Sequence, residues 1–295
     1  MNILLIGKTG QLGGSILAEQ VSHRVFAPGR SELDIESKES CERAIAGFLP
    51  DVVINTAAFH DVPQCEVEPH RAFAVNCQSV RDLALMCKRA GALLVTFSTD
   101  YVFGGGQNTP YREEDCPKPL QMYGISRLAG EMAALAAAPE HCVIIRTCGL
   151  YGLSGAVSKG GNFVDKRIAD AQTNSVLEMG CDQIVSPTYS GDLAQAVLKL
   201  IEHPQLTPGI YHLVNEGACT WFEFTKAIYE LMGINASVHP VDRRGVSGEM
   251  RRPLYSVLAN TRARALGIML PHWRNGLERY LRQKYNSPMK ISQKS

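Results

Sequence analysis

The chain opens with Ile3-Leu4-Leu5-Ile6-Gly7-Lys8-Thr9-Gly10-Gln11-Leu12-Gly13, and this stretch decides the expected fold. Its apolar start predicts a buried strand, and the apolar residues that follow Gly13 at helical spacing predict a helix. Gly7 permits a tight bend, Gly10 lets the backbone approach a pyrophosphate, and Gly13 lets the helix pack on the strand. Free N–H groups at the start of that helix favour an anion. We therefore predict a dinucleotide site, against the alternative of an ordinary glycine-rich turn.

The composition excludes several classes of protein. With 295 residues, 45% apolar content and a net charge of +1, the chain can bury a large core, and its near-neutral charge argues against a nucleic-acid partner. It has no apolar stretch of the roughly 18 residues that a membrane span needs, and no secretory leader pattern at its start, so we expect a cytoplasmic protein without a membrane partner. Nine cysteines without a C-x-x-C motif, and eight histidines without ligand spacing, predict neither a disulfide framework nor a metal site.

The end of the second expected strand, at residues 25–27, indicates the choice of cofactor. NAD-selective Rossmann proteins usually place a carboxylate there, on the ribose 2′-hydroxyl. This chain instead offers the guanidinium of Arg30 and the hydroxyl of Ser31, with Lys8 nearby as a second cation. These groups suit the 2′-phosphate of NADP, and one charge-assisted contact favours NADPH over NADH by about tenfold to a hundredfold. The alternative is a solvated arginine in a turn.

Two further strands are expected at residues 51–55 and 93–97. The carboxyl ends of parallel strands line the ligand crevice of a doubly wound sheet. Ala57 and Ala58 follow the first of these strands, and their small side chains let the backbone pass beneath a nucleotide. Ser98-Thr99-Asp100 follows the second and brings hydroxyls and a carboxylate to the same edge. The alternative for this last cluster is an N-cap and turn.

A long helix expected from Tyr123 to Ala138 carries the pair of side chains most closely tied to chemistry. Tyr123 and Arg127 are four residues apart and therefore share one helical face. A tyrosine donates a proton to a developing alkoxide more readily when a nearby cation lowers its pKa from the ordinary value of about 10. The pair predicts a general acid supported by a cation.

Together these features resemble the dTDP-4-dehydrorhamnose reductases, a family of extended short-chain dehydrogenases/reductases, which also use the G-x-x-G-x-x-G spacing. The resemblance covers most of the chain, and several of its motifs are more specific than a general Rossmann feature. It rests on the glycine turn and on Leu33-Asp34-Ile35, Asp51–Asn55, Ser98–Phe103, Tyr123-Gly124-Ile125-Ser126, Asn162-Phe163-Val164, Asp182-Gln183, Ser186–Tyr189, Trp221–Phe224, Arg251-Arg252-Pro253 and Leu270–Trp273.

The resemblance implies NADPH-dependent reduction of the 4-keto group of a dTDP-linked 6-deoxysugar, as in the biosynthesis of dTDP-L-rhamnose and polysaccharides. Thr99 would orient the ketone, Tyr123 would supply the proton, and Arg127 would hold the nicotinamide ribose. With the residues argued above, the expected cofactor-binding set is Gly7, Gly10, Gln11, Leu12, Gly13, Arg30, Ser31, Asp34, Ile35, Ala57, Ala58, Phe59, Tyr123 and Arg127. The expected substrate-binding set is Thr99, Asp100, Tyr101, Asn162, Arg251 and Arg252.

The chain departs from the family pattern at two functional positions. Arg127 replaces a lysine, and its guanidinium is planar and bonds through a fixed fork where an ammonium is compact. Gly149 replaces a tryptophan that would form an aromatic wall against the sugar. Two alternatives therefore stay open: a non-catalytic NADP-binding subunit with a regulatory or scaffolding role, and a reductase or epimerase of another nucleotide sugar.

We expect an α/β protein with a doubly wound parallel sheet and a smaller C-terminal lobe. Residues 1–150 form the NADP-binding domain, rejoined by parts of 184–215, and residues 151–285 form an interleaved substrate-binding lobe, before a polar tail at 286–295. Arg251 and Arg252 are candidates for contacting a nucleotide diphosphate, whereas Arg243 and Arg244 are expected in a solvated basic loop. The sequence does not fix the oligomeric state, and a homodimer is compatible with it.

Overall fold

The computed structural model describes residues 1–19, 22–155, 161–244 and 250–286, and the expected polar tail lies almost wholly outside this part of the chain. Its centre is a six-stranded parallel sheet with the strand order β10-β5-β4-β3-β1-β2. The sheet consists of β1 (Asn2–Ile6), β2 (Arg24–Phe26), β3 (Val52–Asn55), β4 (Leu93–Thr99), β5 (Cys142–Thr147) and β10 (Gly209–His212).

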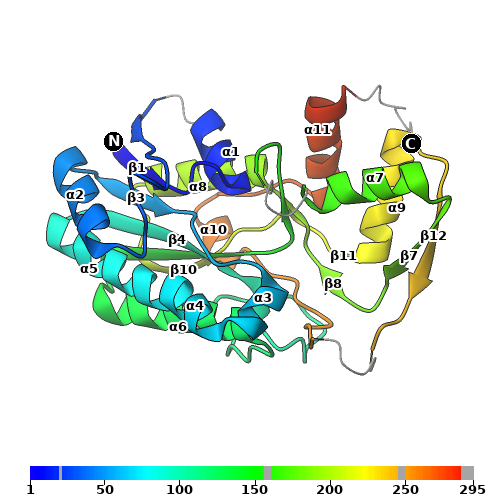
Figure 1. The fold of residues 1–295 in the computed structure, drawn as a ribbon, viewed down its shortest axis with the longest axis horizontal. Coiled ribbons are helices and arrows are strands. Elements are labelled where there is room, and N and C mark those ends of the chain that lie inside the picture. Colours follow the sequence, from blue (N-terminus) through cyan, green and yellow to red (C-terminus); the bar gives the residue numbers. More distant parts are fainter. Residues whose placement is uncertain (20–21, 156–160, 245–249, 287–295) are drawn as a thin grey trace.

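Helices cover both faces of this sheet, because the side chains of each strand alternate between two hydrophobic cores (Figure 1). Ile3 and Leu5 of β1 lie in one core with residues of α1 (Gln11–Glu19), α8 (Ser190–Glu202) and α10 (Thr261–Ala265). Leu4 and Ile6 lie in the other core with residues of α2 (Lys38–Phe48), α5 (Ser79–Ala90) and α6 (Met122–Ala137). The predicted doubly wound α/β fold is confirmed.

The segment from Pro69 to Ala90 is not one continuous helix. It contains α4 (Pro69–Phe73), a π-helical turn η1 (Ala74–Gln78) and α5. The buried side chain of Asn76 in the π turn bonds to the backbone of Phe59, outside the helix. Such turns often occur at functional sites.

The fourth strand is longer than predicted, and the fifth was not predicted at all. β4 continues to Thr99, which carries Ser98 and Thr99 within the sheet. The next-to-last residue of β5 is Arg146, which is almost fully buried and forms an ion pair with Glu131 at 2.7 Å. A buried strand is hard to recognise in the sequence when its apolar run ends in an arginine. A buried charge needs a partner, and only the fold shows that Glu131 is that partner.

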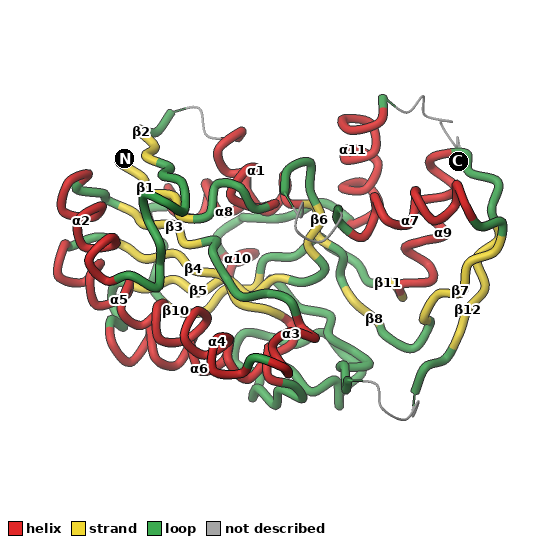
Figure 2. Tube along the Cα trace, viewed as in Figure 1, coloured by secondary structure: helices red, strands yellow, loops and turns green. Residues whose placement is uncertain are grey.

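A smaller group of elements lies beside the large sheet (Figure 2). It contains three two-stranded sheets, which pair β6 (Leu150–Tyr151) with β9 (Thr188–Tyr189), β7 (Val176–Gly180) with β12 (Ser237–Val241), and β8 (Ile184–Val185) with β11 (Cys219–Thr220). The helices α7 (Phe163–Thr173), α9 (Trp221–Met232) and α11 (Trp273–Tyr285) share an aromatic core with them. Between these elements the chain returns to the large sheet through α8 and β10.

Two short elements lie before α6 in the chain. α3 (Val62–Val67) begins after Asp61, whose side chain accepts the N–H of Gln64. Glu66 of α3 accepts the backbone N–H of Met122 at 2.7 Å and so fixes the start of α6. The 3-10 turn η2 (Asp100–Val102) follows β4 directly.

Within the described ranges, no helix has the length and apolar character to cross a membrane, and no cluster of histidine, cysteine or acidic side chains is arranged to hold a metal ion.

Candidate active site

The glycine turn between β1 and α1 is packed tightly against the helix and against β3. Gly7 has a φ of +90°, and the N–H of Gly10 donates to its carbonyl oxygen at 3.0 Å. A Cβ atom at Gly13 would lie only 2.2 Å from the same carbonyl oxygen, so this position requires glycine. The hydroxyl of Thr56, just after β3, lies 2.8 Å from the carbonyl oxygen of Ile6. This close packing is the arrangement that a dinucleotide-binding turn requires.

A pocket of about 240 Å³ opens beside this turn, where β1, β2 and β3 end. Eight of the predicted cofactor-binding residues line it: Gly7, Gly10, Arg30, Asp34, Ile35, Ala57, Ala58 and Phe59. Four others do not. Leu12 lies in the core, Gly13 packs on the turn, Gln11 begins α1, and Ser31 lies outside the lining. Lys8 lines the pocket as expected.

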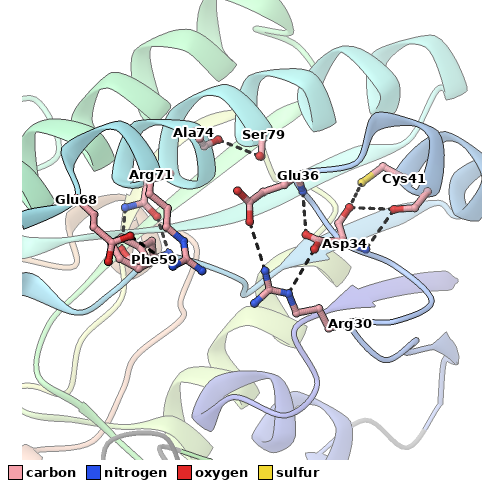
Figure 3. A network of polar contacts seen from close by, with 11 residues as sticks. Arg30, Asp34, Glu36, Cys41, Phe59, Glu68, Arg71, Ala74 and Ser79 are labelled. Atoms are coloured by element: carbon pink, nitrogen blue, oxygen red, sulfur yellow. Dashed lines mark hydrogen bonds and ion pairs between the residues drawn. The ribbon is translucent and has the colours of Figure 1, made fainter. Parts of the chain in front are cut away.

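Arg30 lies in this pocket between two carboxylates (Figure 3). Its Nε is 3.4 Å from Oδ2 of Asp34, and its Nη2 is 3.4 Å from Oε2 of Glu36. The other oxygen of Asp34 accepts the N–H of Glu36 at 3.1 Å, and its carbonyl oxygen accepts the hydroxyl of Ser40 at 2.9 Å. Arg30 therefore lines the pocket with its guanidinium already paired, which the sequence did not reveal.

Phe59 forms a flat apolar surface in the same pocket. Asn76 fixes its backbone by accepting the N–H at 2.9 Å and donating to the carbonyl oxygen at 2.8 Å. The guanidinium of Arg71 lies over the ring, 5.0 Å from its centroid, and pairs with Glu68 at 3.5 Å (Figure 3). An aromatic ring with a cation beside it suits a purine base. Sequence reasoning missed Asn76 and Arg71, because neither belongs to a strand end or a recognised motif.

Thr99 ends β4, and its side chain belongs to a buried network. Its hydroxyl donates to Oδ1 of Asp100 at 3.0 Å and accepts the N–H of Tyr101 at 3.2 Å. Asp100 also accepts from Ser256 at 2.6 Å and from the thiol of Cys148 at 3.1 Å. Burial raises the pKa of Asp100, and these three donors act against that shift. The expectation that Asp100 contacts substrate is not supported by its position, because its carboxylate is buried among these donors.

Tyr123, at the start of α6, lies edge-on to Tyr101, with ring centroids 6.2 Å apart. Burial raises the pKa of Tyr123, while the nearby Arg127 guanidinium lowers it without cancelling the shift. That guanidinium donates to the carbonyl oxygen of Phe97 and, at 3.4 Å, to Oδ1 of Asn76. The predicted influence of Arg127 has the expected sign, but the net pKa shift of Tyr123 is upward.

A second and larger pocket, of about 970 Å³, lies between the two groups of elements. Tyr101 and Gly104 line it from the side of the large sheet, and Phe163, Arg167 and Trp221 line it from the smaller group. Thr99, Tyr123 and Arg127 line neither of the two pockets. Tyr101 links them to the larger one, since its ring contacts that of Tyr123 and also lines this pocket.

Arg251 and Arg252, the predicted pair for a nucleotide diphosphate, are exposed and line the second pocket. The loop after Phe103 packs on this segment, and a Cβ atom at Gly105 would lie 2.6 Å from the N atom of Leu254. Arg243 and Arg244, expected in a solvated loop, also line the pocket. Arg244 is exposed and pairs with Asp242.

Asn162 was predicted to bind substrate, but it does not line the second pocket and instead caps a helix. It is the N-cap of α7, where its side chain accepts the N–H of Asp165 at 3.0 Å. Its amide nitrogen lies 2.9 Å from the carbonyl oxygen of Gly152 and 2.8 Å from the hydroxyl of Tyr280. These contacts occupy its polar atoms, and the residue is 5% exposed.

Gly149, which stands where the family has a tryptophan, lies next to another tryptophan, Trp221. Gly149 has a φ of +55°, and a Cβ atom there would lie 3.3 Å from the Cη2 atom of Trp221. Trp221 packs against Phe163, with ring centroids 4.6 Å apart, and both rings line the second pocket. Trp221 and Phe163 both belong to family motifs in the sequence, but neither was predicted to bind substrate.

Comparison with known proteins places the chain in one family. A family model described as RmlD substrate binding domain matches residues 1–286. The chain belongs to this family. A spore coat polysaccharide biosynthesis protein, SpsK of Bacillus subtilis, is 38% identical over 284 residues, which are 96% of this chain and 97% of that protein. A dTDP-4-dehydrorhamnose reductase of Streptomyces griseus is 38% identical over 282 residues, covering 93% of this chain and 91% of the relative.

A solved member of the RmlD family has nearly the same fold. The crystal structure of dTDP-4-dehydrorhamnose reductase from Bacillus anthracis, in complex with NADP, has a TM-score of 0.89 and 32% sequence identity. The match covers 96% of this chain and 99% of that one. A UDP-glucose 4-epimerase of Thermotoga maritima has a TM-score of 0.82 at 20% identity, which shows the fold alone. The resemblance stated from the sequence motifs is confirmed.

Proposed function

We propose that this protein reduces the 4-keto group of a dTDP-linked 6-deoxy-4-ketosugar with NADPH. The observation that carries the proposal is the cluster of Thr99, Tyr123 and Arg127 where β4 ends and α6 begins, in which Thr99 and Arg127 both act on the phenol of Tyr123, next to Tyr101 of the large pocket. It is supported by relatives that are named reductases of this kind and by the NADP complex of the Bacillus anthracis protein.

The residues of the smaller pocket fit a dinucleotide. Because only glycine fits at Gly13, the helix start stays close to the turn, and its N–H groups are available to a pyrophosphate. Phe59 and Ile35 offer apolar surface to an adenine, and Arg30 offers a cation to the 2′-phosphate. NADPH would supply a hydride from its nicotinamide ring. NADPH binds more tightly than NADH in this proposal.

Tyr123 is the proposed proton donor to the oxygen of the reduced ketone. Its raised pKa keeps the phenol protonated at neutral pH, so the proton is present before reaction. The positive charge of Arg127 then stabilises the phenolate that remains after transfer. In this proposal the hydroxyl of Thr99 turns its proton from Asp100 to the ketone oxygen, while the N–H of Tyr101 continues to donate to the hydroxyl oxygen.

The larger pocket is the proposed site of the nucleotide sugar. Arg251 and Arg252 offer forked donors to its diphosphate, and Trp221 with Phe163 offers aromatic surface to the sugar or the base. In this proposal residues 1–150 and parts of 184–215 bind the cofactor, and residues 151–285 form the interleaved substrate lobe. The expected setting is the cytoplasm, and a homodimer is the assembly we would test first.

A non-catalytic NADP-binding subunit is the second candidate. It is favoured by Arg127, because two of the five N–H donors of its guanidinium are bonded to Phe97 and Asn76 instead of reaching the cofactor. Mixing the purified protein with NADPH and a panel of nucleotide 4-ketosugars, and following cofactor absorbance, separates the two. The reductase oxidises NADPH with at least one dTDP-linked sugar. A protein that binds NADPH but turns over none of them is the non-catalytic subunit.

A further inference from the structure

The cofactor pocket contains a carboxylate whose position works against a phosphate. Glu36 lines the pocket, and its Oε2 lies 3.4 Å from Nη2 of Arg30 (Figure 3). Arg30 is the cation best placed for the 2′-phosphate of NADP, because it lies in the loop that follows β2 and lines the same pocket. The same guanidinium therefore has two competing anions available to it: the side chain of Glu36 and the phosphate.

The two carboxylates near Arg30 differ in what else they do. Asp34 is part of the local fold, since its Oδ1 accepts the N–H of Glu36 and its carbonyl oxygen accepts the hydroxyl of Ser40. The carboxylate of Glu36 contacts only Arg30 within the part of the chain that the structure describes. Its side chain is 36% exposed, so its charge can be removed without opening a buried hydrogen-bond network.

Two other cations line the pocket, Arg71 and Lys8, but neither replaces Arg30 as the partner of a 2′-phosphate. Arg71 lines the pocket but is held over Phe59 and paired with Glu68. Lys8 lines the pocket from the glycine turn, outside the ion-pair group that Arg30 forms with Asp34 and Glu36. The electrostatic balance at the 2′ position is therefore set chiefly by Arg30 against Asp34 and Glu36.

We propose that Glu36 is a specificity-determining residue that limits the preference of this protein for NADPH over NADH. A 2′-phosphate brings about two negative charges at neutral pH. These charges are repelled by Glu36, and they must share a guanidinium that Glu36 already engages. The 2′-hydroxyl of NADH carries no charge and meets neither obstacle. The inference rests on the proposed use of NADP and adds the residue that tunes it.

The test is calorimetric titration of the purified full-length protein with NADPH and, separately, with NADH. Glu36→Gln keeps the size of the side chain and removes its charge. Exposed charge pairs contribute on the order of half a kcal/mol each, so two phosphate charges give an expected gain in NADPH affinity of about fivefold. The affinity for NADH should change by less than about twofold, because that ligand has no charge at the 2′ position.

Glu39→Gln is the matched control, because it removes the same charge three residues later from a side chain that bonds to Ser37 and does not line the pocket. Its NADPH to NADH affinity ratio should stay at the wild-type value. An unchanged ratio in Glu36→Gln overturns the inference, and so does an equal change in Glu39→Gln, which would indicate a general effect of net charge. If Glu36→Gln fails to fold, Glu36→Ala replaces it with the same expected direction. Failure of the wild type to bind either cofactor refutes the proposed function itself, and the inference with it.

Discussion

Replacing Arg127 tests whether its guanidinium supports both the fold and the cofactor. Arg127→Ala removes the charge and both hydrogen bonds, to the carbonyl oxygen of Phe97 and to Asn76. Hydrogen bonds to a charged group contribute about 1.5–3 kcal/mol each, so the loss of two should lower the free energy of unfolding by roughly 3–6 kcal/mol. Arg127→Lys keeps the charge and can keep one of these bonds, so its loss should be about half as large.

The same two variants should separate in their chemistry. Arg127→Ala removes the positive charge that lowers the pKa of Tyr123, so the phenolate left after proton transfer is less stable and kcat should fall. Its NADPH affinity should fall as well, whereas Arg127→Lys keeps measurable turnover. Urea unfolding, NADPH titration and steady-state kinetics measure the three effects. If Arg127→Ala loses stability but keeps wild-type NADPH affinity and kcat, Arg127 only packs the core, and the cofactor role assigned to it is refuted.

Three further predictions concern the larger pocket and the buried ion pair. Trp221→Ala should raise the KM for the nucleotide sugar by about threefold to tenfold while NADPH affinity stays unchanged, and Trp221→Phe should recover part of the loss. Equal kinetics in the wild type and both variants would refute the proposed contact between Trp221 and the substrate. Arg251→Ala or Arg252→Ala should weaken substrate binding and leave NADPH binding unchanged. Unchanged substrate affinity in both variants would show that these arginines are solvated surface residues that do not contact the substrate. Glu131→Gln leaves the buried charge of Arg146 without its partner and should cost about 3–5 kcal/mol of unfolding free energy in urea, whereas a loss below about 1 kcal/mol would contradict the pairing.

Much of the fold could be predicted from the sequence, because its strongest signals are local. The glycine turn, the apolar strands and the helix around Tyr123 each depend on residues near one another in the chain, and their boundaries differ by only a few positions in the structure. β5 was missed because Arg146 makes its end look exposed, and only the distant Glu131 explains its burial. The π turn at Asn76 was missed for a similar reason, since its partner Phe59 lies in another segment.

The candidate site could be predicted less completely, because side-chain direction depends on the surrounding fold. Asp100 and Asn162 were expected to contact substrate, but their polar atoms are occupied by Ser256 and Cys148 in one case and by the start of α7 in the other. The pairing of Arg30 with Glu36 depends on how the loop after β2 folds back on itself, which residue spacing alone does not specify.

The most direct test of the account is the rate at which Tyr123→Phe oxidises NADPH with a dTDP-linked 4-keto-6-deoxysugar. The variant lacks the proposed proton donor, so its kcat should fall by about 10²–10⁴-fold relative to wild type, with NADPH affinity and the unfolding midpoint nearly unchanged. Loss of the ring packing against Tyr101 is excluded as the cause, because phenylalanine keeps the ring. A wild type that turns over the sugar, together with a Tyr123→Phe variant that does so equally fast, would contradict the central claim.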